Sequence, residues 1–167
     1  MKKHWMVSVL VLSCCVVAGC KKGDGWDEYK YKDLGFGISA PSLPIPRPTS
    51  PDEPNTRAYG LKYPNRSEML FSIGPLDMFE SLPDKEKLQK LKDLTVQGTV
   101  SKLISEKELS LDGNPGIEIE IESNHWHSRE RFYIVNGKIL SILSSAPAGQ
   151  PLVADTDRIF DSLHLLK

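Results

Sequence analysis

The clearest pattern in the chain lies in residues 117–122, where isoleucine and glutamate alternate strictly. Apolar side chains at every second position are typical of a strand with one face on a core and the other toward polar surroundings. Leu109 and Leu111 come before this segment, and the turn-forming residues 112–116 separate them from it. We therefore expect a strand at 117–122 that follows a sharp turn.

A hairpin is predicted downstream, because Asn136-Gly137 stands between two apolar segments, 129–135 and 138–143. This dipeptide favours a two-residue turn with both residues at positive φ. Such a turn places Ile134 opposite Ile139 and Tyr133 opposite Leu140. The last strand then has apolar side chains on both faces, which predicts that the sheet is covered on both faces.

The glutamates of residues 117–122 have cationic partners nearby in the sequence. If residues 123–128 form a loop, Glu122 faces Arg129 and Glu120 faces Arg131. Opposite charges on paired strands stabilise a sheet, so this pairing accounts for the charged residues without an active site.

Two helices and further strands complete the prediction. A helix should start at Ser81, with Pro83 in its first turn, and its apolar stripe extends to about Ile104. A short helix after Asp155 would direct Ile159, Phe160 and Leu163 inward. Strands are expected at 36–40, 58–63 and 69–74, and they indicate an α+β domain.

The N-terminus carries a secretion signal. Lys2 and Lys3 precede an apolar segment, residues 5–17, that is too short to span a bilayer, and the segment ends in Ala18-Gly19-Cys20. This ending resembles the lipobox of bacterial lipoproteins, in which the cysteine is acylated and becomes the first mature residue. The alternative is an ordinary secreted protein cut at a nearby Ala or Gly.

The resemblance to a lipobox divides the chain into three parts. Residues 1–19 are expected to be a signal peptide, 20–28 a lipidated tether and 29–167 a single domain. Acylated Cys20 would hold the domain on the bilayer, on the extracytoplasmic side of a membrane of the bacterial cell envelope. Cleavage removes Cys14 and Cys15, so no thiol is left for a disulfide, a metal or catalysis.

Charge argues against nucleic acid as a partner. The formal net charge of the 167-residue chain is −1, and loss of Lys2 and Lys3 makes it more negative. A mildly acidic domain without a long basic segment lacks the positive surface that phosphate binding requires.

One pair of residues is a candidate metal site. His125 and His127 flank Trp126, and on an extended segment their imidazoles would point to the same side. A third ligand would have to come from Glu122 or Asn124. The alternative is an exposed loop in which Trp126 folds back on the sheet.

A second candidate is a surface for a partner. The proline-dense segment 41–54 has PxxP spacing with Arg47 nearby, so a polyproline-II ligand is one interpretation and a stiff surface connection is the other. Pro44, Arg47 and Trp126 are the residues assigned to this surface. The chain has no nucleophile elbow and no glycine-rich phosphate loop, so we expect no enzyme activity and no cofactor.

In the order of its elements, the chain resembles the PsbP-like family, named for an extrinsic photosystem II subunit and shared by a Ran-binding nuclear import factor. The resemblance rests on residues 35–41, 111–118, 131–138 and 159–163. It implies an antiparallel sheet layered between helices, an α/β/α sandwich. Members of the family are mostly docking or assembly subunits without catalytic activity.

Two functions are therefore expected. The first is a membrane-anchored, non-catalytic interaction or assembly module that binds an unknown envelope protein. The second is a lipoprotein that binds a small ligand or a divalent metal through His125 and His127.

Overall fold

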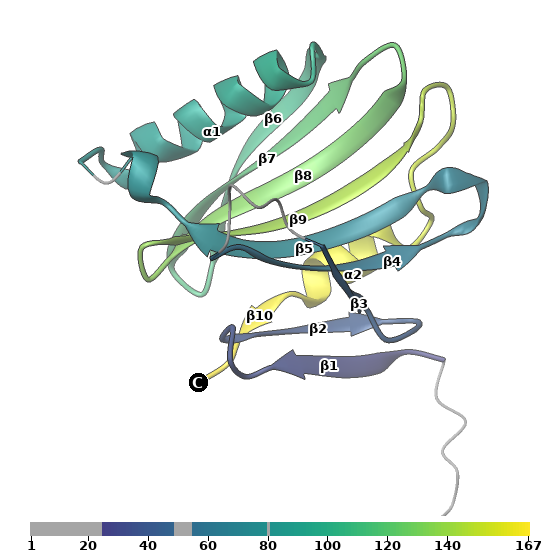
Figure 1. Ribbon diagram of the computed structural model, residues 1–167, viewed down its shortest axis with the longest axis horizontal. Helices are drawn as coiled ribbons and strands as arrows, with labels where there is room; N and C mark the ends of the chain where they lie inside the picture. The colour runs from purple at the N-terminus through teal and green to yellow at the C-terminus, as the bar shows by residue number, and fades with distance from the viewer. Residues whose placement is uncertain (1–24, 49–54, 80) are drawn as a thin grey trace, which may run out of the picture.

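The computed structural model describes residues 25–48, 55–79 and 81–167 of the chain (Figure 1). The expected signal peptide, its cleavage site and the acylated Cys20 lie outside the described residues. So does the part of the proline-dense segment from residue 49 to residue 54.

Two antiparallel sheets and two α-helices build the domain (Figure 1). The large sheet has the strand order β3-β4-β5-β9-β8-β7-β6 and the small sheet has the order β1-β2-β10. Helix α1 (Asp84–Gly98) covers one face of the large sheet, while α2 (Thr156–Ser162) and the small sheet lie on the other. The strands of the large sheet are β3 (Ile45–Arg47), β4 (Arg57–Lys62), β5 (Glu68–Pro75), β6 (Lys102–Leu111), β7 (Asn114–Glu122), β8 (Trp126–Val135) and β9 (Lys138–Pro147).

The small sheet consists of β1 (Asp27–Tyr31), β2 (Phe36–Ala40) and β10 (His164–Leu165). Two 3-10 turns, η1 (Pro64–Arg66) and η2 (Asp77–Phe79), flank β5. The predicted α+β class, with a sheet layered between helices, is confirmed. The small sheet was not part of the prediction, apart from β2, and Asp27 and Glu28 of the expected tether belong to β1.

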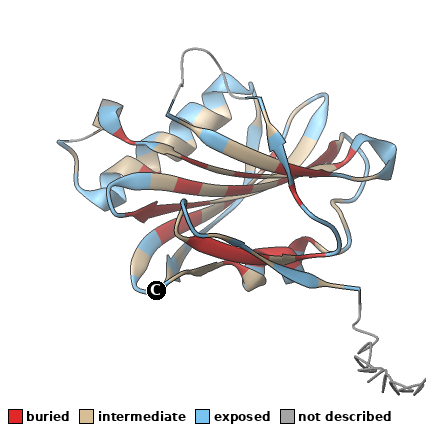
Figure 2. Cartoon of the chain, turned by 60° about the horizontal axis from the view of Figure 1, so that its bottom comes forward, coloured by how far each residue is buried: buried red, intermediate tan, exposed pale blue. Residues whose placement is uncertain are grey.

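Two apolar cores lie on the two sides of the large sheet. Buried residues, red in Figure 2, lie mainly on the strands. On the α1 side, Ile117, Ile119 and Ile121 pack with Leu88 of the helix. On the other side, Phe160 of α2 and Phe36 of the small sheet meet large-sheet residues. The alternation of residues 117–122 thus separates a buried isoleucine row from a glutamate row on the opposite face.

The predicted hairpin at Asn136-Gly137 is confirmed in detail. Val135 pairs with Lys138, Ile134 with Ile139 and Tyr133 with Leu140. Asn136 and Gly137 have φ of 50° and 72°, as the turn requires.

The pairing predicted for the glutamates is wrong by two residues. Glu120 pairs with Arg129 and Glu118 pairs with Arg131, while Glu122 pairs with His127. The reason is a shorter loop: the Ser123 amide donates to the Trp126 carbonyl oxygen at 2.8 Å, and β8 begins at Trp126. A shift of two residues keeps every side chain on its face, so the charges still meet.

The predicted helix bounds are also wrong. Helix α1 begins at Asp84, after Pro83 at the N-cap position, and no side chain caps it, so Ser81 does not have the expected role. The helix ends at Gly98, and the expected end at Ile104 lies in strand β6. At the other helix, Asp155 precedes α2 as expected, but its side chain forms no capping hydrogen bond.

The end of α1 has the hydrogen bonds of a Schellman motif. The Ser101 amide donates to the Val96 carbonyl oxygen (3.0 Å), and the Val100 amide donates to that of Gln97 (3.1 Å). Val100 has a φ of 50°, in the left-handed position that glycine usually takes. Gly98 is the last residue of the helix, so the left-handed position two residues later is taken by Val100 and not by the glycine.

Candidate functional site

A cavity of about 540 Å³ opens on the α1 side of the large sheet. It lies where α1 has ended, between residues 99–101, the β7–β8 hairpin and strands β9 and β5. Small-ligand sites in proteins have volumes of roughly 300–1,000 Å³, so this cavity has the size of a binding site.

One cross-strand row forms part of the lining. Glu68 pairs with Ser145, Ser145 with Ser128, and Ser128 with Ile121, and all four line the cavity. Side chains opposite one another on neighbouring strands lie on the same face. The row is therefore built by strand register and contains two serines between a carboxylate and an isoleucine.

Two exposed apolar side chains also line the cavity. Trp126 has 43% of its surface exposed and Val100 has 87%. Val100 is strained as well as exposed, because a β-branched residue is a genuine outlier at positive φ. Strained backbone and exposed large apolar groups both concentrate at binding sites, so they support the cavity as the candidate site.

The β7–β8 turn is held by a hydroxyl group. The Ser123 Oγ accepts hydrogen bonds from the amides of His125 (3.3 Å) and Trp126 (3.0 Å). These bonds fix the turn that brings Asn124, His125 and Trp126 to the cavity. The Ser123 side chain therefore positions its neighbours.

Glu130 lies next to the cavity row, two residues along β8 from Ser128. It pairs with Leu143, which lines the cavity. Burial raises the pKa of Glu130 to about 8, and a hydrogen bond with Ser141 offsets part of the rise. A carboxyl group with so perturbed a pKa beside a cavity is a further sign of a functional site.

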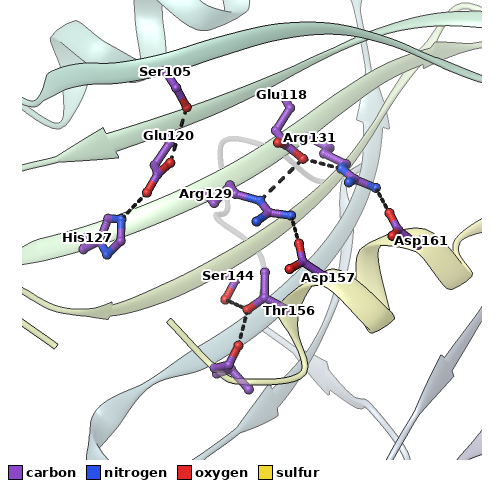
Figure 3. A network of polar contacts seen from close by, with 11 residues as sticks. Ser105, Glu118, Glu120, His127, Arg129, Arg131, Ser144, Thr156, Asp157 and Asp161 are labelled. Atoms are coloured by element: carbon purple, nitrogen blue, oxygen red, sulfur yellow. Dashed lines mark hydrogen bonds and ion pairs between the residues drawn. The ribbon is translucent and has the colours of Figure 1, made fainter. Parts of the chain in front are cut away.

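The opposite face of the large sheet carries a network of ion pairs (Figure 3). Arg131 donates to Glu118 through Nε (2.6 Å) and to Asp161 of α2 through Nη1 (3.0 Å). Arg129 donates to Asp157 of α2, and this hydrogen bond holds the pKa of Asp157 below its usual range. Both guanidinium groups also lie over the Phe160 ring. This network joins α2 to the sheet and has a structural role.

The structure does not bring His125 and His127 together. His125 lines the cavity, whereas the His127 Nε2 forms a hydrogen bond of 2.7 Å with Glu120 Oε1 on the opposite face (Figure 3). Strand β8 begins between them, so the extended geometry assumed for the pair does not apply. Within residues 25–48, 55–79 and 81–167, no cluster of three or more His, Cys, Asp or Glu side chains is arranged to hold a metal ion.

The three residues assigned to a partner surface differ in position. Pro44 is buried and offers no surface to a partner. Arg47 donates to Glu68 of the cavity row at 3.0 Å, so it reaches the cavity indirectly. Trp126 lines the cavity itself.

Several cavity residues were missed from the sequence. The predicted helix extends to about Ile104 and so includes Val100, and no sequence pattern marks Glu68. The two serines of the row, Ser128 and Ser145, could have been found from strand alternation, because each occupies a position on the face where apolar residues dominate.

Comparisons with known proteins show the fold. No protein-family model and no curated protein matches the sequence. The solution structure of cyanobacterial PsbP (CyanoP) from Synechocystis sp. PCC 6803 has a TM-score of 0.61 and 14% identity, and the match covers 88% of this chain and 96% of that one. The chain therefore has a PsbP-like fold, as the sequence resemblance implied.

Two other solved structures are more distant. PA94 from Pseudomonas aeruginosa, a protein of unknown function, has a TM-score of 0.47 and 13% identity, with 74% of this chain and 83% of that one covered. LpqN, involved in cell envelope biogenesis of Mycobacterium tuberculosis, has a TM-score of 0.37 and 11% identity, and the match covers 87% of this chain and 80% of that one. Neither is similar enough to support an argument about function.

Proposed function

We propose that the protein is a membrane-anchored bacterial lipoprotein that acts by binding, as a non-catalytic interaction or assembly module of the cell envelope. The signal with Cys20 at its end supports the anchor and the location. The PsbP-like fold is compatible with a docking role, but a fold alone does not define an activity. The choice of function therefore depends on the site.

The observation that carries the proposal is the cavity with Trp126 and Val100 exposed in its lining. The polar groups around them are hydroxyls, an amide and an imidazole, which are groups suited to recognition. The carboxylate of the lining, Glu68, is already paired with Arg47. The Ser123 hydroxyl accepts two backbone hydrogen bonds and is not poised as a nucleophile.

A second candidate function, a small-ligand-binding lipoprotein that uses the His125 loop, is favoured by one observation. His125 lines the cavity, so a small ligand there would meet the residue that the sequence singled out. The version in which His125 and His127 share a divalent metal is not supported, because His127 is bound to Glu120.

The anchor is tested by labelling cells with a radioactive fatty acid. Wild-type protein should incorporate label, and Cys20→Ala should not. The double variant Cys14→Ala, Cys15→Ala is the matched control and should be labelled like the wild type. Equal labelling of Cys20→Ala and wild type would refute the anchor.

The binding role is tested by photo-crosslinking in living cells. A photoreactive amino acid at Val100, which is highly exposed at the cavity, should capture a reproducible envelope component. The same amino acid at Lys32, an exposed position in the β1–β2 connection, is the control. Equal capture from both positions, or none from position 100, would contradict the proposal.

A further inference from the structure

We infer that the cavity is a binding site for an uncharged saccharide unit, such as a sugar ring of an envelope glycan. The inference rests on the proposed function and names the class of ligand at its site. It follows from the charge, the hydrogen-bonding groups and the apolar surface of the cavity.

The charge of the lining favours a neutral ligand. Glu68 is the one Asp, Glu, Lys or Arg side chain among the described residues that line the cavity. Its carboxylate lies 3.0 Å from an Arg47 guanidinium nitrogen, so its charge is compensated within the protein. A phosphate, a carboxylate or an ammonium group would lose its hydration without gaining a free opposite charge.

The polar groups of the lining require a ligand that forms hydrogen bonds. Ser128 and Ser145 stand side by side in the cavity row, and Asn124 and His125 approach from the turn. Among the described residues, none of these four side chains has a hydrogen-bond partner. A purely apolar ligand would displace water from these groups without replacing its hydrogen bonds, and each such loss is costly. An acyl chain therefore does not match this surface.

The apolar part of the lining requires a ligand with an apolar face. Trp126 is an amphipathic ring with 43% of its surface exposed, and Leu143 and Ile121 contribute aliphatic surface. A sugar ring carries C–H groups on its face and hydroxyls on its edge. It can therefore cover the indole with its face and bind the serines, the amide and the imidazole with its edge.

Binding is tested on the full lipidated chain in phospholipid nanodiscs. The probe is N-acetylglucosamine, used alone and as its β-1,4-linked disaccharide, and binding is followed by saturation-transfer NMR of the sugar protons. N-acetylglucosamine 6-phosphate and hexanoate are the charged and the apolar comparison ligands. The neutral sugars should receive saturation, and both comparison ligands should bind at least tenfold more weakly.

Variants connect this signal to the cavity. Trp126→Ala should weaken sugar binding at least tenfold. Leu94→Ala, which removes an equally exposed apolar side chain from α1 outside the cavity, should leave binding unchanged. Ser128→Ala removes the hydroxyl without adding bulk to the cavity and should weaken binding several-fold. It provides the test if Trp126→Ala does not fold, as judged by circular dichroism.

Three results would overturn the inference. They are no saturation transfer to either sugar, binding by Ser128→Ala equal to that of the wild type, and stronger binding of hexanoate or of the sugar phosphate. If any of them occurs while crosslinking from position 100 persists, the saccharide assignment fails and the interaction module stands. If that crosslinking is also lost, the proposed function fails with it.

Discussion

The two faces of the large sheet use polar residues in opposite ways. On the α2 face, Glu118, Arg131 and Asp161 are joined by hydrogen bonds, and the apolar core lies beside them. On the α1 face, the core lies under the helix, and beyond the helix end Ser128 and Ser145 line an open cavity. Polar groups that satisfy one another hold elements together, whereas polar groups that line a cavity without a protein partner are available to a ligand.

Breaking the ion network of the α2 face should have the largest effect on stability. Arg131→Ala leaves the partly buried Glu118 with the longer ion pair to Arg129 (3.4 Å) and removes the contact with Asp161 and Phe160. We expect a loss of about 2–3 kcal/mol in the free energy of unfolding, measured by urea denaturation. Lys85→Ala removes the exposed Lys85–Glu108 pair at α1 and should leave the free energy of unfolding nearly unchanged. Equal losses for the two variants would remove the contrast between the faces.

A smaller effect, dependent on pH, is expected from Glu130→Gln on the α1 face. The pKa of Glu130 in the folded protein is about 8, above the ordinary value of 4.5, so the folded state retains a proton that the unfolded state releases. The free energy of unfolding should therefore decrease as pH rises from about 4.5 to about 8.

The Gln variant lacks this dependence on pH. At pH 8.5 its free energy of unfolding should exceed that of the wild type by about 1–2 kcal/mol. This difference is smaller than that expected for a fully buried carboxyl group, because Glu130 is partly accessible to solvent. Urea denaturation at pH 5 and pH 8.5 measures the difference. Glu122→Gln, at an exposed position on the neighbouring strand, is the control. If Glu130→Gln follows the wild type at both pH values, Glu130 is not the buried titrating group.

The smallest expected effect is a gain in stability at the cavity. Val100→Gly relieves a β-branched residue at positive φ and should stabilise the protein by about 0.5–1 kcal/mol, after allowance for the entropy of glycine. Leu94→Gly, inside helix α1, should destabilise the protein by about 1 kcal/mol. Sugar binding at the cavity should become weaker in Val100→Gly, so stability and binding would change in opposite directions. A destabilised Val100→Gly would show that the left-handed position carries no strain.

Local sequence signals predicted the strands in the second half of the domain, but they did not predict the β7–β8 turn correctly. Asn136-Gly137 fixes its own turn, so the register of β8 with β9 followed from the sequence. The β7–β8 turn has no such dipeptide. It depends on Ser123 accepting hydrogen bonds from two amides, and the predicted register was two residues off. Hydrogen bonds from backbone amides to one serine hydroxyl leave no sequence pattern from which the length of the turn could be predicted.

The parts of the molecule that the sequence did not predict, strand β10 and the cavity, depend on tertiary structure. Strand β10 has only two residues and forms because β2 is already present as a partner. The cavity was missed because it depends on the end of α1, where Val100 takes a position that favours glycine. At Val100, tertiary packing overrides the preference of a β-branched residue for negative φ. The valine therefore concealed the helix end in the sequence, and its positive φ marks the site in the structure.

The strand order also determines when the domain can close. Strands β6, β7 and β8 each pair with the next strand along the chain, through short loops, so these contacts form early. The core between the sheets is different, because its two halves are far apart in the sequence. Phe36 and Ile38 pack against Ile159 and Phe160, which belong to the part of the chain that is synthesised last. Closure of this core over such a sequence separation is slow. Under the proposed export as a lipoprotein, this delay would keep the chain open for translocation, and we expect the fold to be complete only after the C-terminal helix has crossed the membrane.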